Sequence, residues 1–317
     1  MKIGVVIVTY NRKNELKKAL ELFDGQTCQP EYVMVINNAS TDGTEEVLEQ
    51  WKEKAAGYKR LAVHMESNVG GSGGFYEGLR RAREMDAEWI WVSDDDAFPE
   101  SDALEQAEKY LTEHEDRLSE LSAICGAVIN QGKIDTEHRK RYYPKGIGIV
   151  EEWVSKEEYK KRSFALNAFS YVGTIISRQK LEEAGLTNKD YFIWWDDTEH
   201  SLRLSKVGKI LCVPAIRIRH DVEKTALTVN WKTYYGFRNM TDMYRRHMPR
   251  VCYGYFCLKI VVKVWISRVF GWKKEEMAIL GDAYEDVKKG RFGLHPVYRA
   301  GGGRLRDHEL SGRKITV

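Results

Sequence analysis

The chain has 317 residues and a net charge of +3 at pH 7, and 43% of its residues are hydrophobic and 31% charged. This length predicts one large α/β domain with a smaller appendage, and the composition is that of a folded globular protein. A charge so close to neutral argues against nucleic acid as the main partner. The five cysteines have no metal-knuckle spacing, so we expect reduced thiols and a cytoplasmic location.

The first half of the sequence alternates strand and helix patterns. Residues 3–8 form an apolar run that is too short for a signal peptide and predicts a strand buried on both faces. Similar runs predict strands at 32–36, 61–65 and 89–92, with a helix at 75–85. Such alternation predicts a mostly parallel sheet, and ligands of such sheets bind beyond the carboxyl ends of the strands.

The second half of the sequence is less regular. Residues 130–165 are charged and aromatic, and we interpret them as a long insertion or lid. Further along, the patterns predict a strand at 169–177 around Gly173 and a strand at 210–213 that Pro214 closes.

Three regions follow from these patterns. Residues 1–228 form an α/β domain, residues 229–300 are helical and basic, and residues 301–317 have little hydrophobic pattern. We expect the last region to be a flexible tail.

The most apolar stretch of the basic region is 251–270. Lys259, Lys263 and Arg268 interrupt it, so it does not predict a membrane-spanning helix. Lys259, Lys263 and Ser267 lie four residues apart and form one narrow polar stripe on a helix. Two interpretations stay open: a helix packed inside the protein or against a second copy in a homo-oligomer, and a helix that lies in a membrane surface.

Three adjacent aspartates, Asp94, Asp95 and Asp96, follow the strand predicted at 89–92. Adjacent carboxylates repel one another, and a divalent cation such as Mg²⁺ or Mn²⁺ compensates for that repulsion. Alternate residues at a strand end point the same way, so Asp94 and Asp96 are the natural metal pair. The alternative is a solvated acidic turn or a helix cap, which the apolar strand before the aspartates disfavours.

Four glycines in five positions, Gly70, Gly71, Gly73 and Gly74, follow Asn68. We interpret them as a loop whose backbone can approach a ligand, with the helix after it offering free N–H groups to phosphate oxygens. No lysine follows the glycines, so the segment is not a phosphate loop of the Lys-Ser/Thr type. A flexible turn is the alternative.

Two tryptophans and two aspartates are adjacent at Trp194, Trp195, Asp196 and Asp197. Aromatic rings stack on sugars and carboxylates accept hydroxyl protons, so this cluster is typical of a sugar site. A capped helix start with acidic residues favoured by the helix dipole is the alternative. His220 is of interest as a third metal ligand beside the aspartates, although a lone histidine is more often structural.

In chain order these motifs resemble the inverting glycosyltransferases of family 2, over about the first 220 residues. The similar segments are Val8-Thr9-Tyr10-Asn11-Arg12 at the first strand, Asn37 to Thr44 at the second-strand turn, Asp94-Asp95-Asp96 as the metal-binding motif and Asp196 to Glu199 as the acidic catalytic motif. The glycine segment, the residues around Trp195 and His220 are most similar to the bacterial galactofuranosyltransferase and rhamnosyltransferase branch.

The resemblance implies a nucleotide-diphospho-sugar transferase fold of the GT-A type, with 1–228 as the catalytic domain and a helical C-terminal region. The implied nucleotide and donor residues are Thr9, Tyr10, Arg12, Asn37, Asn68, Gly70, Gly71, Gly73, Gly74, Asp94 and Asp95. The implied metal ligands for Mn²⁺ or Mg²⁺ are Asp94, Asp96 and His220. Asp197 would be the general base and Asp196 would position a hydroxyl, and Trp194, Trp195 and Gly173 would meet the acceptor sugar. Asn37 departs from the family, which usually has aspartate against the base.

The implied reaction is transfer of a sugar to a hydroxyl of a glycan acceptor in cell-surface polysaccharide synthesis. UDP-galactofuranose is the favoured donor and dTDP-rhamnose the second. A sugar-phosphate nucleotidyltransferase, a non-catalytic sugar-binding protein and a membrane-surface protein are the alternatives. A lipid-linked acceptor would put the protein at the inner face of the membrane.

Overall fold

The computed structural model describes residues 1–222 and 229–300. Its contacts divide the chain into two compact units. Unit 1 comprises Met1–Arg141, Glu152–Asn188 and Asp197–Val222, and unit 2 comprises Tyr142–Glu151, Lys189–Asp196 and Glu223–Val317. The region boundaries at 228 and 300 stay predictions, and the tail at 301–317 lies outside the described residues.

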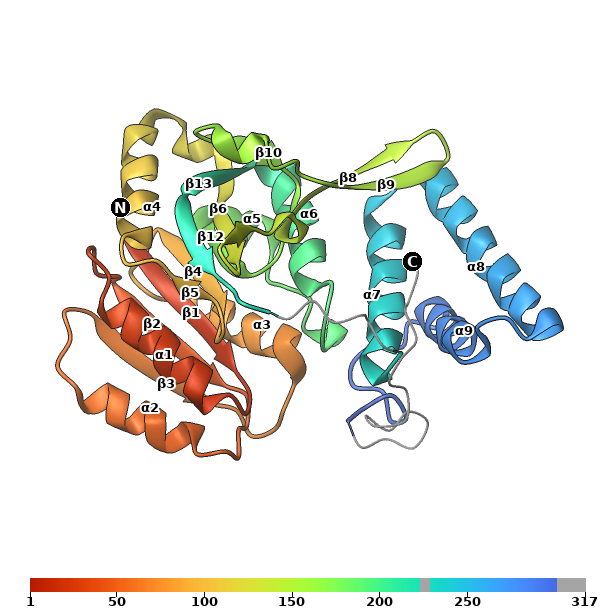
Figure 1. Ribbon diagram of the computed structural model, residues 1–317, viewed down its shortest axis with the longest axis horizontal. Coiled ribbons are helices and arrows are strands. Elements are labelled where there is room, and N and C mark those ends of the chain that lie inside the picture. The colour runs from red at the N-terminus through yellow and green to blue at the C-terminus, as the bar shows by residue number, and fades with distance from the viewer. Residues whose placement is uncertain (223–228, 301–317) are drawn as a thin grey trace. The chain divides into compact units, whose positions relative to one another are not determined.

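Unit 1 is built on a sheet whose first four strands are parallel, in the order β4-β1-β2-β3 (Figure 1). The parallel alternation expected from the sequence is therefore confirmed. Both faces are covered by helices, which is why β1 is apolar and buried along its whole length. These elements are β1 (Ile3–Thr9), α1 (Lys13–Asp24), β2 (Tyr32–Asn37), α2 (Thr44–Glu53), β3 (Lys59–His64), α3 (Gly70–Ala82) and β4 (Trp89–Asp94).

The sheet continues beyond β4 with mixed strand directions, in the order β4-β12-β6-β13-β10. β12 is antiparallel to both of its neighbours, whereas β13 is parallel to β6. The added elements are β5 (Phe98–Pro99), α4 (Ala103–Glu113), β6 (Leu121–Asn130), β7 (Lys133–Ile134), β10 (Phe164–Leu166), β12 (Val172–Ser177), α5 (Arg178–Ala184), α6 (Asp196–Val207) and β13 (Lys209–Arg219).

The sequence predicted a strand that ends before Pro214, and this prediction is wrong for β13. The strand runs on to Arg219, with a register shift against β6 between Cys212 and Arg217. The shift takes the proline out of the ladder with β6, so its missing N–H interrupts no bond of that ladder. The longer strand carries the chain as far as His220.

The charged segment expected as an insertion or lid contains regular structure. A second, three-stranded sheet has the order β11-β8-β9. Its strands are β8 (Arg139–Lys145) and β9 (Gly148–Trp153) within that segment and β11 (Ala168–Phe169) after it. Short 3₁₀ segments lie at Thr136–His138 and Glu158–Lys160, and elsewhere in the chain at Glu115–Glu120 and Lys189–Tyr191.

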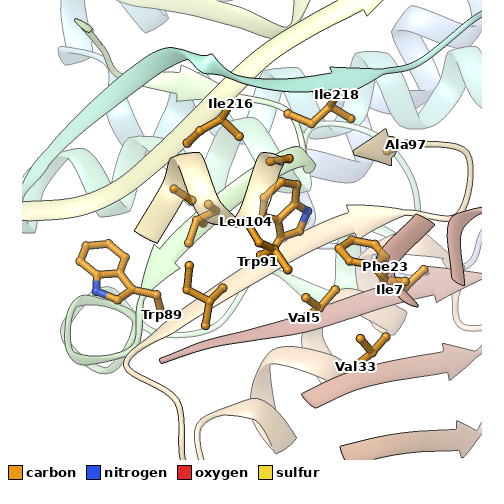
Figure 2. Close-up of a cluster of buried hydrophobic side chains, with 14 of the residues drawn as sticks. Val5, Ile7, Phe23, Val33, Trp89, Trp91, Ala97, Leu104, Ile216 and Ile218 are labelled. Atoms are coloured by element: carbon orange, nitrogen blue, oxygen red, sulfur yellow. The ribbon is translucent and has the colours of Figure 1, made fainter. Parts of the chain in front are cut away.

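Trp91 lies at the centre of one core cluster of unit 1 (Figure 2). Its ring is fully buried and meets Phe23 of α1 edge to face, with 6.0 Å between ring centroids. Leu104 of α4 and Ile216 of β13 belong to the same cluster. Truncating such a side chain costs about 3–5 kcal/mol, so this core fixes the strand that ends at the aspartates.

The glycine segment is the first part of helix α3, so the loop expected there is wrong. A Cβ on Gly74 would lie 2.6 Å from Cγ1 of Val8, and one on Gly78 would lie 2.4 Å from Cγ1 of Val6. Real Cβ atoms do not approach so closely, so these glycines allow α3 to pack directly on β1. Packing against the sheet outweighs the low helix propensity of glycine.

Unit 2 contains three long helices, α7 (Trp231–His247), α8 (Arg250–Phe270) and α9 (Lys274–Lys288) (Figure 1). The helical C-terminal region expected from the sequence is confirmed. Asn230 caps α7 in a reciprocal capping box with Thr233. Across the described residues, no helix is long and apolar enough to span a bilayer.

Candidate active site

The middle aspartate of the triplet joins the first strand to the fourth. Val8 pairs with Asp94 in the β1–β4 register, which brings the end of β1 alongside the aspartates. Thr9 Oγ1 donates to Asp95 Oδ2 at 2.7 Å, and Arg12 Nη1 donates to Asp95 Oδ1 at 3.2 Å. Asp95 is buried, and desolvation raises its pKa to about 6. Asp95 therefore joins the segment from Val8 to Arg12 to the aspartate triplet, and its predicted contact with a donor stays a prediction.

The third aspartate lies between an arginine and a histidine. Arg12 donates to Asp96 Oδ2, and His220 Nε2 lies 3.3 Å from Asp96 Oδ1. Burial alone would raise the pKa of Asp96, but the bonds to His220 and Arg12 outweigh it and lower this pKa to about 2. The backbone N–H of His220 donates to the carbonyl of Ile129 at 2.9 Å, so the end of β6 fixes the histidine at the aspartate.

Asp94, the last residue of β4, is half-buried. Carboxylate oxygens and an imidazole nitrogen suit Mn²⁺ or Mg²⁺ chemically. In the part of the chain that the structure describes, however, no three His, Cys, Asp or Glu side chains form a group that could hold a metal ion. Asp96 and His220 meet, and the three-ligand set with Asp94 stays a prediction.

His138 is a site residue that the sequence did not reveal. Its ring stands perpendicular to that of His220, with 5.3 Å between centroids, and its Nδ1 lies 2.7 Å from Ser170 Oγ. Burial lowers the pKa of His138 to about 3, so the ring is neutral. This uncharged ring packs against the ring of His220. Its segment is irregular and charged, and nothing in that pattern marks one histidine.

Asn38 ties the end of β2 to the start of α3. Its Nδ2 donates to Asn68 Oδ1 and to the carbonyl of Gly70, both at 3.0 Å. Its Oδ1 accepts from the backbone N–H of Val69 at 3.0 Å. Asn68 Oδ1 also accepts from the N–H of Gly70 at 2.8 Å, which satisfies an amide at the beginning of the helix.

Asn37, expected at the nucleobase, is buried at the end of β2. Its Oδ1 accepts from the backbone N–H of Ser40 at 3.0 Å, and its Nδ2 lies 3.2 Å from Nδ1 of His64. An amide oxygen has a second lone pair, so a bond to a base stays a prediction. Tyr10, by contrast, is 44% exposed, so its ring is accessible to a ligand.

The glycines of α3 divide into two kinds. Gly73 and Gly74 are buried, and a Cβ on Gly73 would lie 2.5 Å from Cγ2 of Val69. Gly71 has no atom within 4 Å of an added Cβ, so packing does not require a glycine there. Gly71 is therefore the member whose donor role is the more informative to test.

Gly173 has a structural reason of its own. Its φ is +64°, in the left-handed region, and an added Cβ would lie 2.3 Å from Cδ1 of Ile218. It sits where the pairing of β12 with β4 shifts register between Val172 and Thr174. Its acceptor role stays a prediction.

Asp197 lies near the start of α6, in unit 1. Its Oδ1 accepts from the backbone N–H of Thr198 at 2.6 Å and from the hydroxyl of that residue at 3.1 Å. Desolvation raises the pKa of Asp197 above its usual value, and the bonds from Thr198 only partly offset this. A carboxylate with a raised pKa is a stronger base.

The aromatic segment before it, in unit 2, has an unusual backbone. Phe192, Trp194 and Trp195 have φ values of 67°, 66° and 69°, which side-chain-bearing residues rarely adopt. Asn239 Nδ2 donates to the carbonyls of Tyr191, Ile193 and Trp194, each at 2.9 Å. One amide of α7 therefore fixes this segment, which we call the tryptophan loop (residues 191–195).

Arg238 supports the same loop from the neighbouring position of α7. Its Nη2 donates to the carbonyls of Asp190 and Tyr191 at 3.2 and 2.9 Å. The ring of Trp194, 39% exposed, rests against Gly236, where a Cβ would lie 3.2 Å from its Cε3. Gly236, Arg238 and Asn239 of α7 therefore all contact and support the tryptophan loop.

The structure gathers the predicted residues into distinct groups. Unit 1 brings together Thr9, Arg12, Asp95, Asp96 and His220, and it joins Asn68 to Gly70 through Asn38. Trp194, Trp195 and Asp196 belong to unit 2.

A mixed sheet with carboxylates at the end of β4, and with a histidine directly after β13 that contacts one of them, is the architecture of a GT-A glycosyltransferase. The chain belongs to glycosyl transferase family 2, which matches residues 4–184. The fold and the family expected from the sequence are confirmed.

The chain is similar to named galactofuranosyl and rhamnosyl transferases. Galactofuranosyltransferase GlfT1 of Mycobacterium tuberculosis is 34% identical over 216 residues, and the match covers 65% of this chain and 65% of that protein. The dTDP-rhamnosyl transferase RfbF of Shigella flexneri is 26% identical over 263 residues, covering 78% and 81%. Mannosyltransferase PcManGT of Pyrobaculum calidifontis, solved with GDP-Man and Mn²⁺, has a similar fold with a TM-score of 0.56 at 16% identity, covering 91% of this chain and 75% of that one.

Proposed function

We propose that the chain is an inverting glycosyltransferase that moves galactofuranose from UDP-galactofuranose to a hydroxyl of a glycan acceptor in cell-surface polysaccharide synthesis. The observation that carries this proposal is the state of Asp197, a carboxylate whose pKa burial raises and whose Oδ1 Thr198 holds. Similarity to GlfT1 favours galactofuranose. Similarity to RfbF makes rhamnose from dTDP-rhamnose the second candidate.

The proposed reaction is a single displacement. The acceptor oxygen attacks the anomeric carbon while its proton passes to Asp197. The bond from that carbon to the diphosphate oxygen breaks, and the nucleoside diphosphate leaves with the electron pair. Attack from the opposite face inverts the configuration. A general base of this kind typically contributes about 10²–10⁴-fold to the rate.

The proposed donor pocket lies at the carboxyl ends of β1, β2 and β4. Tyr10 is exposed there, and Asn37 has one oxygen lone pair left for a pyrimidine base. Arg12, whose side chain is 47% exposed, can reach a diphosphate oxygen. The backbone amides at the start of α3, beside Gly71, are proposed to donate to the diphosphate as well.

A divalent cation, Mn²⁺ or Mg²⁺, is proposed at Asp94, Asp96 and His220. The contact of Asp96 with His220 supports this set, as does the oxygen and imidazole chemistry that such ions accept. The bound cation would neutralise the charge of the diphosphate. Calorimetry of UDP binding with and without Mn²⁺ tests it: Asp96→Ala should abolish the metal-dependent part, and unchanged binding would refute the set.

The acceptor is proposed to stack on Trp194 and Trp195, with Asp196 holding one of its hydroxyls. The proposed location is the cytoplasm, at the inner membrane face where the acceptor is lipid-linked. Incubation with a panel of UDP- and dTDP-sugars, followed by product analysis, tests the whole proposal. Release of a free nucleoside diphosphate with an inverted glycoside supports it, and release of pyrophosphate would indicate a nucleotidyltransferase instead.

A further inference from the structure

Helix α8 exposes a continuous apolar face. The side chains recur at alternating intervals of four and three, so they lie along one side of the helix. This set, which we call the α8 face, is Val251, Tyr255, Leu258, Val262, Trp265 and Val269. Leu258 is 58% and Trp265 60% exposed, and Phe270 at the end of the helix and Trp272 just beyond it are exposed as well. Exposed apolar surface of this extent marks an interaction site.

Basic residues border the α8 face on both sides. At the 100° turn of a helix, Lys259 and Lys263 fall along one edge, and Arg250 and Arg268 fall along the other. Residues 250–274 contain six Lys or Arg and no Asp or Glu. The surface is therefore apolar at its centre, cationic at both edges and without acidic compensation in this stretch.

The opposite side of α8 holds the helix in unit 2. Cys252, Ile260 and Ser267 are buried, and Ile260 packs with Met277 and Leu280 of α9. A mostly apolar cavity of about 230 Å³ lies against α8, and Tyr255, Lys259, Lys263 and Trp272 are among the residues that line it. Internal packing thus uses mainly one side of α8, and the residues of the α8 face remain exposed.

We propose that the α8 face docks on an anionic phospholipid bilayer, with the helix lying parallel to its surface. The acyl boundary takes the apolar centre and the lipid phosphates take both basic edges. Tyr255, Trp265 and Trp272 are of the kinds that concentrate at such interfaces. Two copies paired through this face would bring their basic edges together with no carboxylate in 250–274 between them, which disfavours a dimer as the occupant.

Vesicle flotation of the full chain tests the proposal, with phosphatidylcholine vesicles compared with equal parts of phosphatidylcholine and phosphatidylglycerol. The chain should float with the anionic vesicles, and less so as salt rises. Leu258→Glu with Trp265→Glu should weaken binding at least about tenfold, since both side chains leave the apolar layer. Lys259→Gln with Lys263→Gln should weaken binding to anionic vesicles about tenfold or more.

Trp153→Glu is the matched control, because Trp153 is 56% exposed on β9 and outside the α8 face. It should float as the wild type does, and thermal melts should show that every variant is folded. Folded double-Glu protein that still floats overturns the proposal, as does equal flotation with neutral and anionic vesicles. So does a wild-type dimer that this variant splits while neither protein binds vesicles. No donor or acceptor is needed, so the outcome is independent of the proposed function.

Discussion

The side-chain amide of Asn239 donates to the backbone carbonyl of Trp194 at 2.9 Å. The same amide holds two further carbonyls of the tryptophan loop, whose backbone has three residues at positive φ. A strained loop persists only where its surroundings fix it. Asn239 is therefore a positioning residue for the proposed acceptor site.

Asn239→Ala should slow turnover by more than its loss of stability accounts for. Loss of the amide leaves carbonyls without their donor and should cost about 1–3 kcal/mol of unfolding free energy. Asn230→Ala is the matched control: it removes the cap of the same helix, at about 1 kcal/mol, without touching the loop. Steady-state kinetics and urea unfolding of both variants test this. Equal loss of turnover in the two would mean that Asn239 acts through stability alone.

Asp197→Asn should lower turnover by about 10²–10⁴-fold and leave donor binding nearly intact, because asparagine keeps the size of the side chain but accepts no proton. Calorimetry with UDP and product assays measure the two effects. Asp86→Asn, which alters an exposed carboxylate paired with Lys2, should change neither. Turnover near the wild-type rate would remove Asp197 from the mechanism.

The acid limb of the pH profile should reflect the raised pKa of Asp197. The base works only when ionised, so kcat/KM should fall as the pH drops through this pKa, above the ordinary value of 3.8. The profile of wild type should be compared with that of Asp197→Glu. An acid limb at or below the pKa of an ordinary aspartate would contradict the assignment.

Asp95 should make the apoprotein less stable as the pH rises. Its folded pKa of about 6 lies above its unfolded value, so between the two the folded state binds more protons. Unfolding free energy then falls as pH increases, by roughly 1 kcal/mol between about pH 5 and 7. Urea unfolding at both pH values should show this slope relative to Asp95→Asn. A constant difference between the two proteins would refute it.

Two glycines of α3 form a matched pair. Gly74→Ala should destabilise the protein by about 1–3 kcal/mol, because the methyl group would meet Val8. Gly71→Ala meets open space and should preserve or slightly raise stability. Thermal melts measure this, and UDP titration of Gly71→Ala then isolates any donor effect. Equal melting of both variants would contradict the packing account.

Local patterns were sufficient for much of the fold and for part of the site. The apolar runs predicted β1, β2 and β4, and the rule that ligands bind at the carboxyl ends of strands pointed to Asp96. The start of α3 was mispredicted because glycine is a poor helix former in isolation, whereas its contact with Val8 is tertiary. Pro214 misled for the same reason, since the register shift that tolerates it depends on β6.

The structural roles that the sequence did not reveal depend on contacts with distant backbone. Asn38 bonds to the start of α3, some thirty residues away, and Asn239 bonds to the tryptophan loop. An asparagine carries no periodic signal, so its partner is visible only in the folded chain. His138 could not be predicted for the same reason. Its contact with His220 depends on the 3₁₀ segment that ends at His138 and on β6 and β13, which position His220.

The bond between Thr9 and Asp95 spans 86 residues of sequence, and the contact of Asp96 with His220 spans still more. Loop-closure entropy opposes such contacts until the intervening strands have paired. We therefore expect the contact of Asp96 with His220 to form only after β13 has joined the sheet. During synthesis on the ribosome, a nascent chain that stops short of β13 has Asp94, Asp95, Asp96 and Asp197 but lacks His220.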